Sequence, residues 1–380
     1  MNEDKMNVRP VPLSNPDLVK EDALAVAEVL RGDRLSIGPV LEQFEAAIAK
    51  QACRKYGIGV NSGTSGLHLC VKALGISEGD EVITPSFSFV ATTNCLLFER
   101  AKPVFVDIDH TYNIDPAQVE AAITPRTKAI LPVEVFGNTA HFDEYERIAQ
   151  KHNLIMIEDC CEALGGRLGQ RHAGSFGAAG VFAFYPNKQI TTGEGGVIVT
   201  DSEEIRDLCK SMRNQGRDTV AWLSHARLGY NYRLSEINAM LGLRQMNRLD
   251  EILDKRRRAA GLYNQALADI QGIHLPPMTQ PDNASWFVYV IRLGDDFERS
   301  HRDAVMKELQ RNGVGCNPYF VPIHTQPYVT ELLGPGEGML PMTEKVSART
   351  LALPFFGNIT EEQVDRVSSV LRDALANCRR

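Results

Sequence analysis

Two residues whose types can support covalent and proton-transfer chemistry lie at the ends of strand-like runs in this sequence. Lys188 falls within VFAFYPNKQITTGEGG (Val181–Gly196), and Asp159 ends the apolar run LIMIED, 29 residues earlier (188 − 159). A lysine amine can form a Schiff base with an aldehyde, while a carboxylate can keep a ring nitrogen protonated. Pyridoxal phosphate requires both groups. The alternative to a cofactor function is that Lys188 is an ordinary surface lysine in a loop and that Asp159 only caps the end of a strand.

Other short patterns near these residues could bind parts of the same cofactor. The run NSGTSG (Asn61–Gly66) precedes an apolar helical segment, and the free backbone N–H groups at a helix start can bind a phosphate. A plain helix cap explains the same residues. Phe87 and Phe89 follow a strand, and strand alternation lets one of them face a ring while the other packs in the core. Cys160 and Cys161 have no matching ligand cluster, so we expect buried thiols and no metal site.

The elements that must position these residues alternate regularly between Val60 and Thr200. Short apolar or β-branched runs alternate with segments of helical period, which predicts a mostly parallel sheet with helices on both faces. The expected fold class is therefore α/β. Strands are predicted at 81–85, 103–109, 128–133, 154–159, 180–184 and 195–200, and helices at 65–74, 89–98, 116–122 and 143–152.

Beyond Asn231 the pattern changes to one long helical stretch with a broad apolar stripe, which predicts a link to a second unit. A strand-like run at 285–293, a helix at 302–312, a Pro- and Gly-rich loop at 317–341 and a helix at 361–377 predict a smaller C-terminal α+β domain. The expected division is a large domain over residues 1–250 and a small domain over residues 251–380.

Composition excludes several classes of function. The 380 residues carry a formal net charge of −7, which argues against a nucleic-acid partner. The basic run Lys255–Arg258 is interspersed with acids and predicts a solvated helix face. Eight scattered cysteines and a start without an apolar signal core predict reduced thiols in a cytoplasm. No stretch approaches the ~20 apolar residues of a membrane span, so no membrane association is expected.

The ordered motifs resemble a known enzyme family. They are NSGTSGLHL, GDEVITPSFSFVATTN, PVFVDID, IEDCCEALGG, GSFG, FAFYPNKQITTGEGG and GYNYRLSEINAMLGL. In this order, from about Gly38 to the end of the chain, they resemble the DegT/DnrJ/StrS family of nucleotide-sugar aminotransferases. The resemblance implies the fold of the aspartate aminotransferase superfamily (fold type I), the cofactor pyridoxal phosphate, and a homodimer whose active sites lie at the subunit interface.

The resemblance also implies roles for single residues. Lys188 would be the Schiff-base lysine and Asp159 the partner of the ring nitrogen, with Phe89 stacked on the ring and Glu162 near its hydroxyl. The phosphate would be bound by the turn that contains Gly63, Thr64 and Ser65, and by Asn231 of the neighbouring subunit. The candidates for contacts to the sugar nucleotide are Arg233, Tyr319 and His324. Three positions differ from the frequent family pattern: Ala183 in place of serine, Glu134 in place of histidine, and Glu162, where relatives often carry glutamine or histidine and some carry Glu.

The predicted reaction moves an amino group from L-glutamate to the keto group of a nucleotide-linked sugar, with a 4-keto-6-deoxy sugar favoured and a 3-keto sugar as the alternative. A related sugar 3-dehydratase would carry histidine in place of Lys188. A non-catalytic binding protein on this scaffold would be expected to lack Lys188 or Asp159. Both residues are present.

Overall fold

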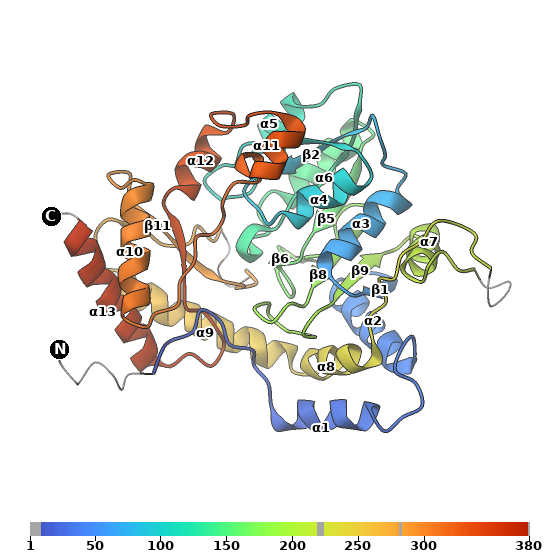
Figure 1. The fold of residues 1–380 in the computed structure, drawn as a ribbon, viewed down its shortest axis with the longest axis horizontal. Coiled ribbons are helices and arrows are strands. Elements are labelled where there is room, and N and C mark those ends of the chain that lie inside the picture. The colour runs from blue at the N-terminus through green and yellow to red at the C-terminus, as the bar shows by residue number, and fades with distance from the viewer. Residues whose placement is uncertain (1–8, 219–223, 280, 282, 379–380) are drawn as a thin grey trace.

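A seven-stranded sheet lies at the centre of the larger part of the molecule (Figure 1). The computed structural model describes residues 9–218, 224–279, 281 and 283–378. The five strands from β8 to β3 are mutually parallel, whereas β9 runs antiparallel to both β1 and β8. The predicted α/β class with a mostly parallel sheet is confirmed. In sheet order the strands are β1 (Tyr56–Val60), β9 (Gly196–Thr200), β8 (Ala179–Ala183), β5 (Ile155–Asp159), β4 (Thr127–Ile130), β2 (Glu81–Pro85) and β3 (Lys102–Val106).

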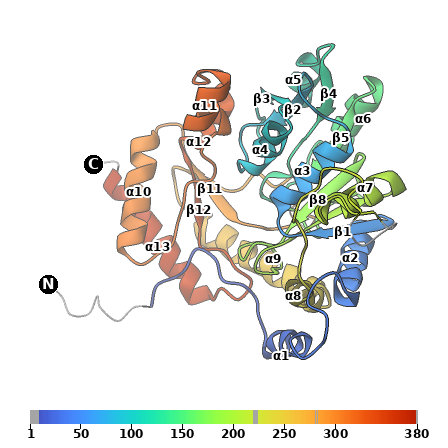
Figure 2. The ribbon, with the colours of Figure 1, turned by 45° about the vertical axis from the view of Figure 1, so that its right-hand side comes forward.

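Helices cover both faces of this sheet because its strands are apolar on both sides (Figure 2). Ile157 and Val181 point into a core shared with α3 (Gly63–Ala73), α4 (Ala91–Phe98) and α7 (Glu203–Arg213). Their neighbours Met156 and Phe182 point the other way. That second face is covered by α2 (Pro39–Gln51), α5 (Pro116–Ala121) and α6 (Phe142–Lys151).

The strands and helices predicted between residues 60 and 200 are present, with their ends shifted by no more than three residues. The sequence patterns did not predict β1, α1 (Lys20–Val29), α2 or α7. In β1, YGIGV, two glycines dilute the strand pattern. Gly57 is required there because a Cβ atom at this position would lie 2.2 Å from the carbonyl oxygen of Glu45.

A second, smaller core forms around a three-stranded antiparallel sheet of β10 (Ile273–His274), β11 (Tyr289–Leu293) and β12 (Thr350–Leu353). It is covered by α10 (Arg299–Arg311) and α13 (Glu361–Cys378). Val11 also packs into this core, and its N–H donates to the carbonyl of Gly313 at 2.8 Å. The remaining short elements are β6 (Arg167–Leu168), β7 (Arg171–His172), η2 (Val135–Gly137), η3 (Ile323–Thr325), α11 (Pro327–Leu333) and α12 (Pro341–Ser347).

The long helical stretch after Asn231 is two helices rather than one. α8 (Glu236–Met246) ends at Asn247, and α9 starts at Leu249 and runs to Leu267. The first part of α9 packs against the core of the large sheet through Ile252 and Leu253, and its last part packs into the small core. α9 therefore links the two cores, and the division at residue 250 stays a prediction.

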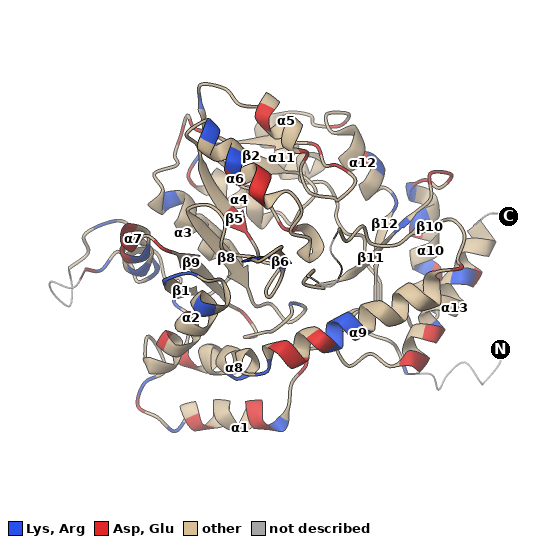
Figure 3. Cartoon of the chain, turned by 180° about the vertical axis from the view of Figure 1, so that it is seen from behind, with Lys and Arg blue, Asp and Glu red and all other residues tan. Residues whose placement is uncertain are grey.

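The acids of α9, Asp250, Glu251 and Asp254, lie in its first turns and are followed by the basic run Lys255–Arg258 (Figure 3). Lys255 forms ion pairs with Asp17 at 2.8 Å and with Glu251 at 2.7 Å. The prediction of a solvated helix face is wrong for one member of the basic run, because Arg256 is only 4% exposed. Within the described ranges, no helix is both long and apolar enough to cross a bilayer.

Candidate active site

A cavity of about 510 Å³ opens where the parallel strands of the large sheet end. Asp159 is the last residue of β5, and Ala183 is the last residue of β8. Residues of the small domain, among them Phe287 and Tyr319, complete the lining. Open parallel sheets bind ligands at this edge, where the chain leaves each strand and side chains converge. The volume is in the range of sites for small molecules and cofactors.

Asp159 presents a buried carboxyl group to this cavity. The residue is 4% exposed, and its Oδ2 accepts a hydrogen bond from the Thr92 hydroxyl at 2.9 Å. Its Oδ1 accepts the N–H of Cys161 at 3.2 Å. Burial raises the pKa of Asp159, while these hydrogen bonds and the charge of Lys188 act in the opposite direction. A cation next to this carboxyl group would favour its ionised form, so the site suits a protonated ring nitrogen.

Lys188 lies in the loop after β8 and points its amine into the cavity. Its side chain is 14% exposed, and Nζ lies 3.4 Å from Oε1 of Glu162 and 3.9 Å from the ring centroid of Phe287. Glu162 is kept in place by the N–H of Phe136, which donates to Oε2 at 2.8 Å. Burial raises the pKa of the Glu162 carboxyl group. The long ion pair and the aromatic face hold the amine less firmly than a short salt bridge would, which leaves it available for reaction.

The N-terminus of α3 faces the same cavity through Gly63 and Thr64. Ser62 caps the helix by accepting the N–H of Ser65 at 3.1 Å, and the Ser65 hydroxyl donates to Oδ1 of Asn61 at 2.6 Å. Ser65 therefore serves the cap and does not line the cavity. The first backbone N–H groups of a helix lack partners within it and carry partial positive charge. This end of α3 fits a phosphate group.

The two aromatic residues after β2 have different environments. Phe89 lines the cavity and is 62% exposed, whereas Phe87 is fully buried among other rings. Ala183 also lines the cavity and offers no hydroxyl group there. Tyr319 lies across the cavity, where its hydroxyl is 3.4 Å from Nδ2 of Asn187, and burial raises its pKa to about 12. Among these residues, Phe89 has the open face that a stacked ring would need.

Besides Ser65, three predicted site residues do not line this cavity. The carbonyl of Asn231 accepts a hydrogen bond from Asn61 at 3.3 Å, and Asn231 is exposed. Arg233 donates to Oδ1 of Asn214 at 3.1 Å. His324 is 2% exposed, with Nδ1 at 2.6 Å from the Ser86 hydroxyl and Nε2 at 3.1 Å from Oε1 of Glu344. These last contacts give His324 a structural function at the junction of the two domains.

The sequence patterns did not single out several residues that the structure places at the cavity. Thr92 lies almost one helical turn after Phe89, so its proximity could have been inferred from helical spacing. Phe287 comes from the small domain, and no local pattern could place its ring beside Lys188. Tyr185, Asn187 and Glu194 flank Lys188 in the chain and line the cavity with it.

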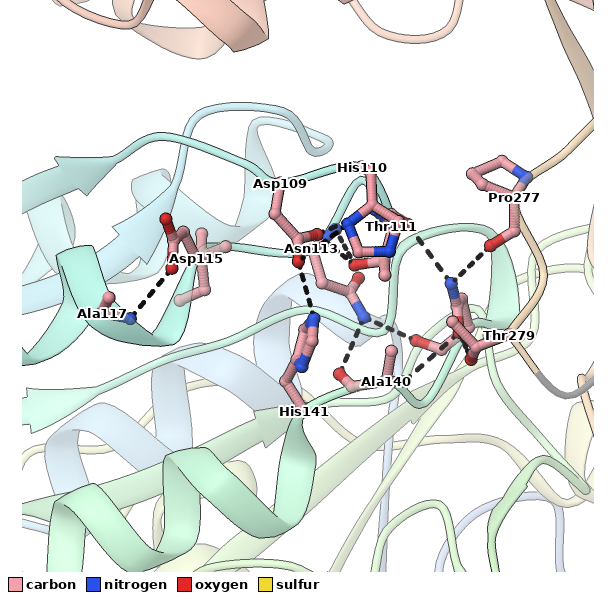
Figure 4. Close-up of polar contacts among 12 residues, drawn as sticks. Asp109, His110, Thr111, Asn113, Asp115, Ala117, Ala140, His141, Pro277 and Thr279 are labelled. Atoms are coloured by element: carbon pink, nitrogen blue, oxygen red, sulfur yellow. Dashed lines mark hydrogen bonds and ion pairs between the residues drawn. The ribbon is translucent and has the colours of Figure 1, made fainter.

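A network of side-chain amides fixes the turn that carries Phe136. Asn113 donates to the carbonyls of Asn138 at 2.8 Å and Ala140 at 3.1 Å, and its Oδ1 accepts the N–H of Val135 at 3.1 Å (Figure 4). Asn138 in turn donates to the carbonyl of Pro277 at 3.2 Å, which ties this turn to the segment that enters the small domain. The position of the N–H that holds Glu162 therefore depends on polar contacts behind the cavity.

Two buried carboxyl groups also lie behind the cavity. Glu134 and Glu158 are 0% exposed, and a carboxylate oxygen of each lies within 4.8 Å of the other and of Sγ of Cys160. Glu158 accepts the N–H groups of Gly174 at 2.5 Å and Phe176 at 2.8 Å, but neither oxygen of Glu134 has such a donor. Burial and the neighbouring carboxyl group raise the pKa of Glu134 well above its usual value. Burial and the like charge of Glu158 therefore favour the protonated form of Glu134.

The arrangement defines a class of protein. A parallel sheet whose carboxyl edge brings a lysine amine, a buried aspartate and a helix N-terminus to one cavity is the arrangement expected of a pyridoxal phosphate enzyme of fold type I. Comparison with known proteins then gives the family. The chain belongs to the DegT/DnrJ/EryC1/StrS aminotransferase family, whose model matches residues 16–372.

Individual relatives cover nearly the whole chain. Spore coat polysaccharide biosynthesis protein SpsC of Bacillus subtilis is 36% identical, with 96% of this chain and 96% of SpsC aligned. GDP-perosamine synthase of Caulobacter vibrioides is 38% identical, with 90% of this chain and 91% of that enzyme aligned. The structure of PseC from Helicobacter pylori, an aminotransferase involved in the biosynthesis of pseudoaminic acid, has a TM-score of 0.93 at 29% identity, covering 97% of this chain and 100% of PseC.

These findings confirm the predicted family, fold type and cofactor. Enzymes of this family depend on pyridoxal phosphate, and the chain is a sugar aminotransferase that uses this cofactor. The residues present fit the group: Lys188 for its aldehyde, Asp159 for its ring nitrogen and the N-terminus of α3 for its phosphate.

The protonated state of Glu134 has a consequence for stability. A carboxyl group whose pKa is raised by folding contributes stability below its unfolded pKa, near 4.5, and this contribution is lost as the pH rises through the folded pKa. Glu134→Gln keeps a hydrogen-bond donor without needing a proton. We expect the melting temperature of this variant, relative to wild type, to rise between pH 5 and pH 8. Because one proton is involved, the difference in the free energy of unfolding should change by at most about 1.4 kcal/mol per pH unit.

Scanning calorimetry at a series of pH values measures this difference. Glu362→Gln on the exposed face of α13 is the matched control, and its difference from wild type should not change with pH. A difference between Glu134→Gln and wild type that is equally constant would show that Glu134 is ionised in the folded protein.

Proposed function

We propose that this enzyme transfers an amino group from L-glutamate to the keto group of a nucleotide-linked sugar, with a 4-keto-6-deoxy sugar as the preferred substrate. The observation that carries the proposal is the placement of the Lys188 amine and the Asp159 carboxyl group on the same cavity. The match to GDP-perosamine synthase supports a nucleotide-linked sugar as the substrate class. L-Glutamate as donor is the expectation from the family resemblance.

When bound, pyridoxal phosphate supplies an aldehyde that condenses with amines and a ring that accepts electron density from the adjacent carbon. Lys188 performs two tasks in this reaction. Its amine would hold the cofactor covalently. Once free, Nζ would take a proton from the α-carbon of the donor and deliver it to the cofactor carbon on the other side of the nitrogen. Glu162, 3.4 Å away, keeps Nζ within the cavity. In the second half of the cycle Lys188 moves the proton in the opposite direction, onto the sugar.

The remaining residues bind and orient the cofactor. Asp159 keeps the ring nitrogen protonated, Phe89 stacks against the ring and Glu162 lies near the ring hydroxyl. Gly63 and Thr64 bind the phosphate through the N-terminus of α3, and Ser65 acts through the cap that fixes this turn. Tyr319 lines the cavity and is the candidate for a sugar contact in the same subunit. Arg233 remains a candidate through the partner subunit, whereas the contacts of His324 argue for a structural function.

Two alternatives use the same scaffold. A 3-keto sugar aminotransferase would share all the residues above and differ only in how the sugar is oriented. A sugar 3-dehydratase is disfavoured by Lys188, which occupies the position where that branch is expected to have histidine. We also expect a cytoplasmic location, because all eight cysteines are free thiols.

We propose a homodimer with shared active sites. The described residues that line the cavity include three acids, Asp159, Glu162 and Glu194, and one amine, Lys188. A cofactor phosphate and a nucleotide diphosphate would add further negative charge, so the site needs groups from outside this chain. The exposed apolar residues of the N-terminal segment, Leu18, Leu24, Leu30 and Leu35, are candidates for the interface.

Lys188→Ala should abolish covalent capture of the cofactor. Wild-type protein with pyridoxal phosphate should show a visible absorbance band that borohydride removes, and mass spectrometry should then find the reduced cofactor on the peptide that contains Lys188. The variant should show neither. Lys210→Ala, at an exposed lysine of α7, is the control and should behave as wild type. A cofactor found on another lysine would contradict the assignment.

Incubation of the holoenzyme with L-glutamate and a panel of sugar nucleotides tests the reaction. We expect 2-oxoglutarate and an aminated sugar, detected by mass spectrometry, with the highest rate on a 4-keto-6-deoxy sugar. Asp159→Asn keeps the shape of the side chain but not its charge. It should lower kcat about a hundredfold, because loss of a buried charge partner costs about 3 kcal/mol or more. Bound cofactor without any aminated product across 3-keto and 4-keto sugars would refute the proposal.

Mixed dimers test whether the active sites are shared. If Asn231 serves the partner subunit, a dimer of one Lys188→Ala chain and one Asn231→Asp chain contains one site with both residues intact. Each variant alone should be inactive or nearly so, because the first lacks the reactive amine and the carboxylate introduced in the second would repel the cofactor phosphate. Differently tagged chains, expressed together and purified as mixed dimers, should recover about half of the wild-type activity per dimer. No recovery, or a monomer in sedimentation, would contradict shared sites.

A further inference from the structure

Arg256 is a buried cation in the middle of α9. Its neighbours in the basic run make ordinary surface contacts, such as the ion pair of Arg257 with Asp254. Arg256 instead turns inward and is 4% exposed. No carboxylate among the described residues lies within ion-pair distance of it, and burial lowers its pKa to about 10, which still leaves it charged at neutral pH.

The guanidinium group of Arg256 donates to three backbone carbonyls. Nη2 donates to the carbonyl of Lys188 at 2.7 Å, and Nη1 donates to those of Phe287 at 3.1 Å and Trp286 at 3.3 Å. Its Nε has no partner among the described residues. These contacts join three segments that are far apart in sequence: helix α9, the loop after β8 and the strand-like segment that enters the small domain.

Stability alone gives a poor reason for this arrangement. A guanidinium group loses much hydration when it is buried, and neutral carbonyls compensate for that loss less well than a carboxylate does. Two of the three carbonyls that Arg256 binds belong to Lys188 and Phe287. The side chains of these two residues meet in the cavity, with Nζ 3.9 Å from the ring centroid.

We propose that Arg256 is a positioning residue that fixes the backbones of Lys188 and Phe287 relative to each other. The Lys188 amine then keeps a fixed distance from the Phe287 ring in the cavity. The fork of the guanidinium group suits this task, because its nitrogens diverge in a fixed plane and can bind separate acceptors. A lysine at this position could keep the charge but could not span the same carbonyls. The inference rests on the proposed covalent function of Lys188.

Two substitutions separate positioning from charge and from folding. Arg256→Met removes the charge and the donors but retains a long side chain, and Arg256→Lys retains the charge. Arg257→Met, at the neighbouring half-exposed position, is the matched control. After removal of the cofactor, pyridoxal phosphate is added back, and the rate of formation of the borohydride-reducible bond to Lys188 is followed by absorbance, together with the melting temperature of each cofactor-free protein.

We expect both Arg256 variants to form the bond at least about tenfold more slowly than wild type, since small misplacements of a reacting group have effects of this size or larger. The melting temperature of Arg256→Met should fall, because the carbonyls of Lys188, Phe287 and Trp286 lose their donor. Arg257→Met should match wild type in both measurements. A normal rate in Arg256→Lys would overturn the proposal. So would a rate in either Arg256 variant that returns to the wild-type value when each protein is assayed equally far below its own melting temperature. If wild-type protein forms no bond at Lys188, the proposed function itself fails.

Discussion

The buried charge of Asp159 constrains much of the surrounding structure. At 4% exposure, with hydrogen bonds from Thr92 and Cys161 as its support, the carboxyl group can be ionised only if its surroundings are otherwise neutral or positive. Glu158 and Asp159 are adjacent in β5 and so point to opposite faces of the strand. Glu158 is stabilised on its own face by two backbone N–H groups, and the raised pKa of Glu134 favours its neutral form, which adds no further negative charge nearby.

Asp159 and Lys188 are positioned by different means. Asp159 ends a central strand, so sheet pairing on both sides fixes its backbone. Lys188 lies in a loop, where no ladder of hydrogen bonds sets its position. Its backbone N–H donates to the carbonyl of Tyr185, its carbonyl accepts from Arg256, and its side chain is bounded by Glu162 and Phe287. A reactive amine that must move between two bonding partners benefits from a fixed backbone and a loosely held side chain.

The sequence was most informative where function depends on local chain geometry. A strand end predicts where Asp159 lies, and the pattern that opens α3 predicts a helix N-terminus that can face a phosphate. The sequence was least informative about contacts between residues that are distant from each other in the chain. The spacing of charges around Arg256 is that of a solvated helix, and only the packing of α9 between two cores reveals that this one residue faces inward. His324 follows the same rule, since its partners Ser86 and Glu344 are 238 and 20 residues away.

Ala183 lines the cavity but has no hydroxyl group, so other groups must bind the cofactor phosphate. Ser65, the nearest serine in the turn after Ser62, donates its hydroxyl proton to Asn61, so it contributes to the helix cap rather than to the cavity. The lining near α3 then offers backbone N–H groups and the side chains of Ser62 and Thr64. A phosphate dianion accepts more hydrogen bonds than these groups provide at one helix end. If the chain forms the proposed homodimer, groups of the partner subunit should therefore contribute to retention of the cofactor.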